Sequence, residues 1–415
     1  VWYGGLLFAM VSFTGGCDEP VLVLGRYVMK TGDVLGEGRS SICRKATCTK
    51  TGNTVVVKTY KPRDKKSTEL MFRRQVEVLQ ALALPFEKPD DQRLWHPDFM
   101  NADPSDFFMA LIDFSGDANG APSLDPVHKC YFVVTEFAQY SLKDYVRHSV
   151  DSQTVNDVQS MAVAILRVVS ALHAKGLVHL DLKPANLMLF NGKLKLIDVD
   201  GCVRAGSRLF KQDRSISYSL SHCSPEWAQF VCGKPSAGPA PESVDVVPGL
   251  DAWSVGIIIC ELALGCSPLA RDFIRISAQK SYQAGKHDCL CWLSTLQKVM
   301  LPADINLNYM LRDIVQTQLL VPLSKRTTVA ECLSRHCLEG AGTWPIVFAS
   351  VSLQKGVFSK WRFPKWRHLR RRKKADCHEG PTRLRSLFLR KSLSWPGTNS
   401  SSARSSLITP PVLTA

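Results

Sequence analysis

The sequence predicts an α+β protein of two lobes, a small β-rich N-terminal lobe and a larger, mainly helical C-terminal lobe. Short β-rich runs separated by glycine turns occupy residues 27–61, and the apolar period becomes helical after residue 137. With 415 residues, the chain is long enough for two substantial cores. Its composition, 45% hydrophobic and 21% charged, excludes fibrous and wholly disordered classes of protein.

The N-terminal lobe is expected to begin with a glycine-rich hairpin. Its Gly-Glu-Gly turn covers residues 36–38, and a second turn at residues 51–53 precedes a β-rich run that ends at Lys58. Apolar side chains on one face predict a helix over residues 67–84. Residues 85–127 are rich in Pro and Asp, which predicts a long insertion around one or two strands.

The C-terminal lobe is expected to follow a buried strand at residues 131–137. Over residues 155–175, apolar side chains recur at steps of three and four, which predicts an amphipathic helix. Residues 251–264 are apolar nearly all round, as in a helix buried at the centre of a large lobe. Further helices are expected as far as Leu338.

These patterns divide the chain into an N-terminal extension (1–26), a two-lobed domain (27–338) and a basic, Ser/Pro-rich tail (339–415). The lobes cover residues 27–137 and 138–338. Residues 1–16 are apolar and uncharged, and we expect either a packed or poorly ordered extension or the remainder of a signal peptide. No run of 18 or more clearly apolar residues occurs, so no membrane-spanning helix is predicted.

Within the predicted C-terminal lobe, residues 177–201 carry side chains suited to phosphoryl transfer. Asp181, Lys183 and Asn186 have the spacing of H-R-D-L-x-x-x-N, and Asp198 follows at the Asp of D-F-G. We expect Asp181 to accept or orient the proton of the incoming hydroxyl and Lys183 to neutralise the transferring phosphate. Asn186 and Asp198 offer the oxygen ligands that Mg²⁺ requires.

The glycine turn and the strand after it complete the predicted nucleotide site. Gly36 and Gly38 are two of the three glycines of G-x-G-x-x-G, with Ser41 in the third place. Such a turn alone indicates no more than a hairpin. Lys58 follows about twenty residues later, in a Val-Val-Val-Lys run similar to V-A-I-K, and is expected to grip the α and β phosphates of ATP.

Over residues 27–338 these motifs resemble the eukaryotic protein kinase family. Ser224-Pro225-Glu226 is similar to A-P-E, residues 251–256 are similar to D-x-W-S-x-G, and Arg326 is similar to the arginine that pairs with the A-P-E glutamate. The resemblance implies that Asp251 braces the catalytic loop. It also implies a buried Glu226–Arg326 ion pair.

By the same resemblance, the adenine pocket lies beside the strand at residues 131–137. Thr135 is then the gatekeeper, and the backbone from Glu136 to Ala138 meets the adenine. Leu35, next to the glycine turn, belongs to the same cofactor-binding set. The implied cofactors are ATP and Mg²⁺.

Lys183, two residues after Asp181, and Ser219, seven before Glu226, favour serine or threonine over tyrosine as the acceptor. The expected function is therefore a serine/threonine protein kinase whose partner is a protein substrate with a Ser/Thr acceptor. The alternative is a rhoptry-type pseudokinase that acts as a nucleotide-binding scaffold or adaptor. The presence of every catalytic residue of the motifs favours the active enzyme.

Two positions of the catalytic segment depart from the family pattern. Leu180 replaces the Arg of the loop and cannot pair with a phosphate, so activity is not expected to need activation-loop phosphorylation. Asp200 replaces the glycine of D-F-G and is expected to point to solvent, with a magnesium-facing role as the alternative. The helical partner of Lys58 is left open between Gln75, through a neutral hydrogen bond, and Glu77, in a shifted register.

The non-Arg loop, the altered D-F-G and the insertion after a helix ending in Ala-Leu-Ala-Leu-Pro are together similar to the rhoptry kinases of apicomplexan parasites. This resemblance implies secretion from rhoptries into the host cell or its parasite-containing vacuole. An unusual intracellular Ser/Thr kinase, cytoplasmic or nuclear, is the competing interpretation.

Residues 355–415 hold 15 Lys and Arg but only two acidic residues, so the basic character of the chain belongs to its tail. Cations interleaved with aromatics at residues 355–374 suit an anionic membrane surface, and a tail without a dedicated partner is the alternative. Nuclear import or nucleic-acid binding is less expected.

The fourteen cysteines show no paired CxxC with zinc spacing, so mostly free thiols are predicted. The oligomeric state is left open.

Overall fold

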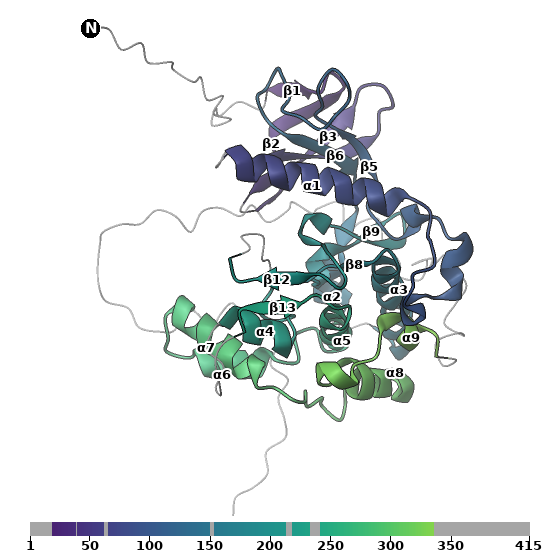
Figure 1. Ribbon diagram of the computed structural model, residues 1–415, viewed down its shortest axis with the longest axis vertical. Helices are drawn as coiled ribbons and strands as arrows, with labels where there is room; N and C mark the ends of the chain where they lie inside the picture. Colours follow the sequence, from purple (N-terminus) through teal and green to yellow (C-terminus); the bar gives the residue numbers. More distant parts are fainter. Residues whose placement is uncertain are drawn as a thin grey trace, which may run out of the picture. The chain divides into compact units, whose positions relative to one another are not determined.

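The structure is a computed structural model that describes residues 19–38, 40–61, 65–149, 153–212, 218–232 and 241–335. The predictions for residues 1–16 and for the basic tail lie outside the described residues. Within the described part, a β-sheet lobe precedes a helical lobe (Figure 1).

A six-stranded antiparallel sheet forms the N-terminal lobe, in the order β1-β2-β3-β4-β6-β5. Its strands are β1 (Pro20–Val23), β2 (Tyr27–Glu37), β3 (Ser41–Cys48), β4 (Thr54–Tyr60), β5 (Leu111–Phe114) and β6 (Phe132–Glu136). The sheet thus begins within the segment that the sequence assigned to the N-terminal extension. In β4, the β-branched residues Val55 and Val57 alternate with more exposed neighbours and enter the core, as period-two burial requires.

One helix, α1 (Lys65–Ala83), lies across the N-terminal sheet (Figure 1). Its buried face is built from Phe72, Val76 and Leu79, which follow one another at steps of four and three. Leu70 is apolar but 68% exposed, so it does not belong to this buried face. The helix itself matches the predicted range to within two residues at either end.

The Pro- and Asp-rich insertion is a packed structure rather than an open loop. It contains β5 and three short 3₁₀ helices, η1 (Gln92–Leu94), η2 (Pro97–Asn101) and η3 (Pro104–Asp106). Phe86 stacks on the fully buried Phe99 with ring centroids 5.1 Å apart, and Phe107 meets Phe99 edge-on at 5.6 Å. These aromatic contacts supply the core that the local sequence pattern does not reveal.

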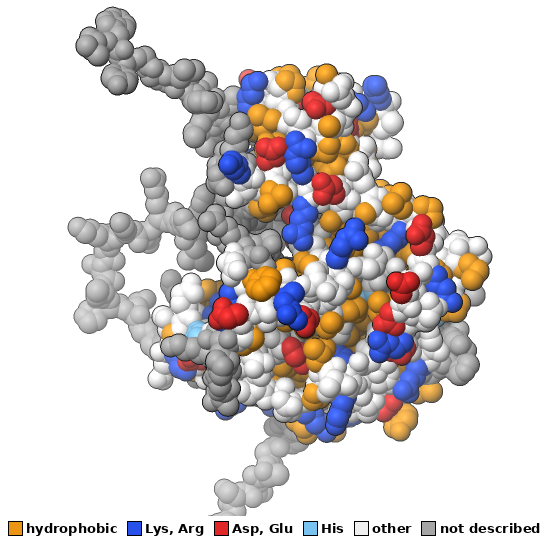
Figure 2. Space-filling model, viewed as in Figure 1, with side chains coloured by type: hydrophobic (Ala, Val, Ile, Leu, Met, Phe, Trp, Pro, Cys, Tyr) orange, Lys and Arg blue, Asp and Glu red, His pale blue; other side chains and the backbone are white. Residues whose placement is uncertain are grey.

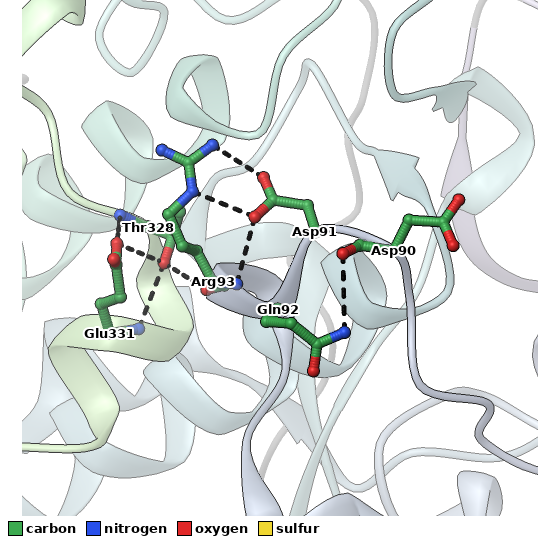
Figure 3. A network of polar contacts seen from close by, with 6 residues as sticks. All are labelled: Asp90, Asp91, Gln92, Arg93, Thr328 and Glu331. Carbon is green, nitrogen blue, oxygen red and sulfur yellow. Dashed lines mark hydrogen bonds and ion pairs between the residues drawn. The ribbon is translucent and has the colours of Figure 1, made fainter.

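Polar contacts join the insertion to α9 (Val329–Leu333) in the C-terminal lobe (Figure 3). The Thr328 hydroxyl donates to the carbonyl of Arg93 at 2.6 Å, while Thr328 and Glu331 form the capping box of α9. Asp91 accepts hydrogen bonds from the backbone and side chain of Arg93. The segment after α1 is therefore fixed to the larger lobe.

The C-terminal lobe surrounds two buried helices, α3 (Val155–Ala174) and α5 (Gly249–Leu264). The other helices are α2 (Leu142–Ser149), α4 (Pro225–Cys232), α6 (Ala270–Ser277), α7 (Tyr282–Ser294) and α8 (Tyr309–Ile314). Short strands complete the lobe: β7 (Tyr140–Ser141), β8 (Leu177–Val178), β9 (Leu187–Phe190), β10 (Lys193–Leu196), β11 (Val203–Arg204), β12 (Arg208–Phe210) and β13 (Ser243–Asp245).

Among the described residues, α3 alone is long and apolar enough to cross a membrane by length and composition. Its side chains are mostly buried in the lobe, and it packs against α5 and α9. The apolar sequence of α3 is thus explained by its place in the core. On the face shown in Figure 2, basic and acidic side chains are interspersed with apolar ones.

Candidate active site

Asp251, near the start of α5, fixes the backbone just before Asp181. Its carboxylate is fully buried and accepts hydrogen bonds from the backbone nitrogens of His179, at 2.7 Å, and Leu180, at 2.9 Å. A ring nitrogen of His173 lies 3.2 Å from the same carboxylate. A buried carboxylate is tolerated when it has such partners, so the bracing role expected of Asp251 is confirmed.

The Asp181 carboxylate is held between two side chains. Lys183 donates from Nζ to one oxygen, and the Ser219 hydroxyl donates to the other, each at 2.7 Å. The side-chain amide of Asn186 donates to the carbonyl of Asp181 at 3.1 Å. Three of the predicted site residues therefore lie together, and the carboxylate has a fixed orientation.

The β9–β10 hairpin brings Asn186 and Asp198 to the same end. Leu187, which starts β9, pairs with Leu196, which ends β10, so the residues just outside both strands are neighbours. The Ile197 nitrogen also donates to the Asn186 carbonyl at 2.9 Å. Asp198 itself adopts a left-handed backbone conformation, with φ 59°. The two predicted metal ligands therefore lie at the same end of this hairpin.

Lys58, on β4, contacts the acidic segment, residues 198–202, that follows β10. Its Nζ lies 3.1 Å from a carboxylate oxygen of Asp200 and 3.9 Å from one of Asp198. The Asp200 side chain is only 17% exposed. The expectation that Asp200 points to solvent was wrong, because the charge of Lys58 draws its carboxylate into the site.

The charges of this group influence one another. Burial alone would lower the pKa of Lys58, but Tyr60 and the carboxylates of Asp200 and Asp198 raise it, so the ammonium stays charged. Burial opposes ionisation of Asp200, yet the charge and hydrogen bond of Lys58 lower the pKa of that carboxyl. Burial, and after it repulsion from Asp200, raises the pKa of Asp198. One ammonium is therefore shared by two carboxyl groups.

Neither candidate on α1 reaches Lys58. Gln75 is 1% exposed and accepts a hydrogen bond from the Tyr60 hydroxyl, while Glu77 is exposed. Within the described part of the chain, no hydrogen bond joins either side chain to Lys58, so neither of the two partners left open by the sequence is observed. Instead, Arg74 of α1 donates to the carbonyl of Cys202 at 2.6 Å. This bond attaches the helix to the acidic segment.

The predicted nucleotide residues of the N-terminal sheet gather at one end of neighbouring strands. Gly36 pairs with Cys43, which pairs with Lys58 on the next strand. Gly38 donates from its backbone to the carbonyl of Ser41 at 2.9 Å and closes the turn. Leu35, just before this turn, is half-buried.

The end of β6 is fixed by hydrogen bonds to the side chain of Glu136. Thr135 is 4% exposed and pairs across the sheet with Val56. Glu136 accepts two hydrogen bonds from Lys195, at 2.7 and 2.9 Å, and one from the Ala110 nitrogen at 2.8 Å. Ala138, at the other end of the predicted adenine-binding backbone, is 8% exposed. Sequence reasoning missed Lys195, whose position on β10 gives no local sign of a partner on β6.

The Glu226–Arg326 ion pair expected from the resemblance is confirmed. Arg326 is fully buried and contacts both carboxylate oxygens of Glu226, at 3.1 and 3.2 Å. It also donates to the carbonyls of Gly249 and Val321. Because each charge is paired and hydrogen-bonded, the pair is tolerated in the core and fixes α4 against the start of α5.

A β-sheet lobe with one crossing helix, a helical lobe, and a lysine facing two acidic groups between them define the bilobal protein-kinase fold. Residues 110–338, more than half of the chain, match the family model for the protein kinase domain, so the chain belongs to this family. The match begins after most of the N-terminal sheet.

The chain is similar to several curated kinases. It is 28% identical to cyclin-dependent kinase D-1 of Arabidopsis thaliana, over 44% of this chain and 38% of that protein. It is 29% identical to the carbon catabolite-derepressing protein kinase of Secale cereale, over 49% and 35%. It is 27% identical to the serine/threonine-protein kinase PAK 4 of Homo sapiens, over 33% and 21%. The matched segments span less than half the length of each of these relatives.

Proposed function

We propose that the protein transfers the γ-phosphoryl group of ATP to serine or threonine hydroxyls of protein substrates. The observation that carries this proposal is the Asp181 carboxylate, oriented by Lys183 and Ser219 at 2.7 Å each. An oriented carboxylate can accept the proton of an acceptor hydroxyl, and the neighbouring ammonium can neutralise charge on the phosphoryl oxygens. Positioning and charge neutralisation are the main requirements of this reaction.

The donor set fits magnesium. Mg²⁺ prefers carboxylate and carbonyl oxygens, which Asp198 and the Asn186 amide provide, with Asp200 close by. Because the Asn186 amide nitrogen donates to Asp181, its oxygen remains available as a ligand. The carboxylates of Asp198 and Asp200 share one ammonium, that of Lys58, and a bound cation would relieve the repulsion between them. When bound, Mg²⁺ supplies neutralisation of the phosphate charge.

Nucleotide binding is assigned to the residues at the strand ends and after β6. Lys58 would contact the phosphates, the turn containing Gly36 and Gly38 would cover them, and the backbone from Glu136 to Ala138 would meet the adenine. The contact of Lys58 with Asp200 supports this assignment, since it holds the ammonium at the acidic segment. Thr135 and Leu35 complete the proposed pocket.

The proposed acceptor type is supported by the Ser219 hydrogen bond and by the relatives. PAK 4 is a serine/threonine-protein kinase by name. Ser219 bridges to Asp181 from the segment before α4, where an acceptor peptide would approach. Leu180 has an apolar, half-buried side chain that packs against the lobe core, and it supports a site that needs no activation-loop phosphate.

Transfer from labelled ATP to a generic protein substrate, followed by phosphoamino acid analysis, tests the proposal. The wild-type chain is expected to label Ser or Thr, and Asp181→Ala and Asp198→Ala are expected to abolish the label. Equal labelling by wild type and both variants would reveal a contaminant. Label on tyrosine alone would contradict the acceptor assignment.

A nucleotide-binding scaffold is the second candidate function. The observation that favours it is the buried Gln75, which leaves Lys58 without a partner on α1. This candidate predicts an ATP-induced rise in melting temperature that Lys58→Ala removes, together with no transfer by the wild type. Measurable transfer that Asp181→Ala abolishes would contradict it.

The similarity to rhoptry kinases leads to a proposal on localisation, namely secretion from rhoptries into the host cell or its vacuole. Microscopy of the tagged full chain in a parasite would test it, and retention in the parasite cytoplasm or nucleus would contradict it.

An anionic membrane is the proposed partner of residues 355–374, which lie outside the described residues. Cosedimentation with phosphatidylserine vesicles, lost on deletion of residues 355–415, is the expected result.

A further inference from the structure

Three potential metal ligands meet on the C-terminal lobe, away from the residues assigned to phosphoryl transfer. Cys232 ends α4, and His287 and Cys291 lie on α7. One ligand atom from each residue lies within 4.8 Å of both others. Paired CxxC spacing does not reveal this cluster, because its members come from two helices that are far apart in the sequence.

The packing of the helices explains why these side chains converge. Figure 1 shows α7 beside α4, and the two helices are in extensive contact. His287 and Cys291 are four residues apart, so they lie on the same face of α7. Cys232 is about nine-tenths buried, Cys291 is half-buried and His287 is exposed.

The separation between the Cys291 thiol and the His287 ring agrees with tetrahedral coordination. With Zn–S of about 2.3 Å and Zn–N of about 2.0 Å, tetrahedral angles give an S···N separation of about 3.5 Å. Sγ of Cys291 lies 3.5 Å from Nε2 of His287. A thiol–imidazole hydrogen bond would produce a similar distance, and the second thiol, that of Cys232, lies within 4.8 Å of both atoms.

We propose that Cys232, His287 and Cys291 bind a zinc ion, with water in the fourth position. Two thiolates and an imidazole are soft and borderline ligands, which favour Zn²⁺ over Mg²⁺ or Ca²⁺. Because His287 is exposed, water has access to the remaining position. The ion clamps the end of α4 to α7.

The clamp lies next to the acceptor side of the proposed active site. Lys286, the neighbour of His287, places its ammonium 4.6 Å from the ring centroid of Tyr218. Tyr218 precedes Ser219, whose hydroxyl is bonded to Asp181. Zinc would therefore stabilise the two helices that support this segment. The site itself does not depend on whether the chain is an active kinase.

Zinc stoichiometry of the full chain tests the proposal. Metal analysis after exposure to Zn²⁺ and desalting is expected to show about one zinc equivalent more in the wild type than in Cys232→Ser or Cys291→Ser. His287→Gln changes an exposed residue, so it is expected to fold and to bind zinc at least tenfold more weakly. Cys266→Ser, at an exposed cysteine outside the cluster, is the matched control and should keep the wild-type stoichiometry.

Melting temperature and Co²⁺ absorption test zinc binding even if a cysteine variant fails to fold. Zn²⁺ should raise the melting temperature of the wild type and of Cys266→Ser, but not that of His287→Gln. Co²⁺ should give a thiolate-to-metal charge-transfer band in the same two proteins only. Equal zinc content in wild type and His287→Gln would overturn the proposal.

Discussion

Asp200 takes the place that the family resemblance assigns to a helical glutamate. Its carboxylate lies 3.1 Å from Lys58, while Gln75 turns to Tyr60. The kinase family has glycine at position 200. With glycine there, Lys58 would keep only its contact with the Asp198 carboxylate, 3.9 Å from its Nζ. The carboxylate that Gln75 lacks on α1 is thus supplied to Lys58 by Asp200.

Replacing Asp200 tests this pairing. Asp200→Gly is expected to lower kcat/KM for ATP by about tenfold, equivalent to ~1.4 kcal/mol, because Lys58 loses its nearer charged partner. Adding Gln75→Glu should restore much of the loss by returning a carboxylate to α1. Steady-state kinetics of both variants measures the coupling, with Glu77→Gln as the control at an exposed site of the same helix. Additive losses would show that the two positions are not coupled.

Ser219 is expected to position Asp181 through its hydroxyl. Ser219→Ala should lower kcat by roughly tenfold, since one oxygen of the carboxylate loses its donor, and Ser219→Thr should keep most of the activity. The melting temperature of both variants should stay near that of the wild type, because Ser219 is half-buried in a loop. Equal kcat for Ala and Thr would contradict the positioning role.

At the scale of elements, the central helices could be predicted and the insertion could not. Periodic apolar residues predict α3, and a run that is apolar nearly all round predicts α5, because both helices bury most of their side chains in one lobe. The insertion has no periodic pattern, since its order comes from tertiary contacts such as Phe86 with Phe99. The motifs located Asp181, Lys183 and Asn186 correctly beside one another, because their spacing along one loop fixes their proximity.

Long-range partners were the part that the sequence could not reveal. Lys58 with Asp200 and Lys195 with Glu136 join residues far apart in the chain. For Asp200, the lysine on β4 decides the direction of the side chain, whereas its local sequence suggests an exposed turn. The same reason explains why the Cys232–His287–Cys291 cluster was missed.

Close packing of α5 against the segment after α8 gives a prediction for two glycines. A Cβ at Gly256 would lie 2.7 Å from Cδ2 and 2.9 Å from Cγ of the buried Leu320, and 3.1 Å from Cβ of Leu319. At Gly249 the nearest atom, at 2.6 Å, is the end of the half-buried Leu323 side chain, which can rotate away.

Gly256→Ala is therefore expected to destabilise the lobe by about 1–3 kcal/mol, less the ~1 kcal/mol that alanine adds to helix propensity. Gly249→Ala should be close to neutral. Thermal or urea unfolding of the pair measures the difference. A Gly256→Ala variant as stable as Gly249→Ala would show that Leu319 and Leu320 can move.

At the scale of the molecule, the two lobes are joined at the active site by unmodified side chains. Lys58 reaches Asp198 and Asp200, and Arg74 binds the carbonyl of Cys202. Leu180 brings no positive charge to recruit a phosphate. These contacts hold α1 and the N-terminal sheet to the acidic segment without phosphorylation, and they support the proposal, central to this account, that the folded chain is active as synthesised.

The candidate phosphorylation sites of the activation segment are Ser207, Ser215, Ser217 and Tyr218, of which Ser215 and Ser217 lie outside the described residues. The most direct test measures initial rates of phosphoryl transfer by phosphatase-treated protein and by a variant with the three serines changed to Ala and Tyr218 to Phe. Both should keep the wild-type rate to within tenfold, or ~1.4 kcal/mol, and Asp181→Ala should be inactive. Loss of transfer in the treated protein and the variant, with ATP binding retained, would contradict the claim.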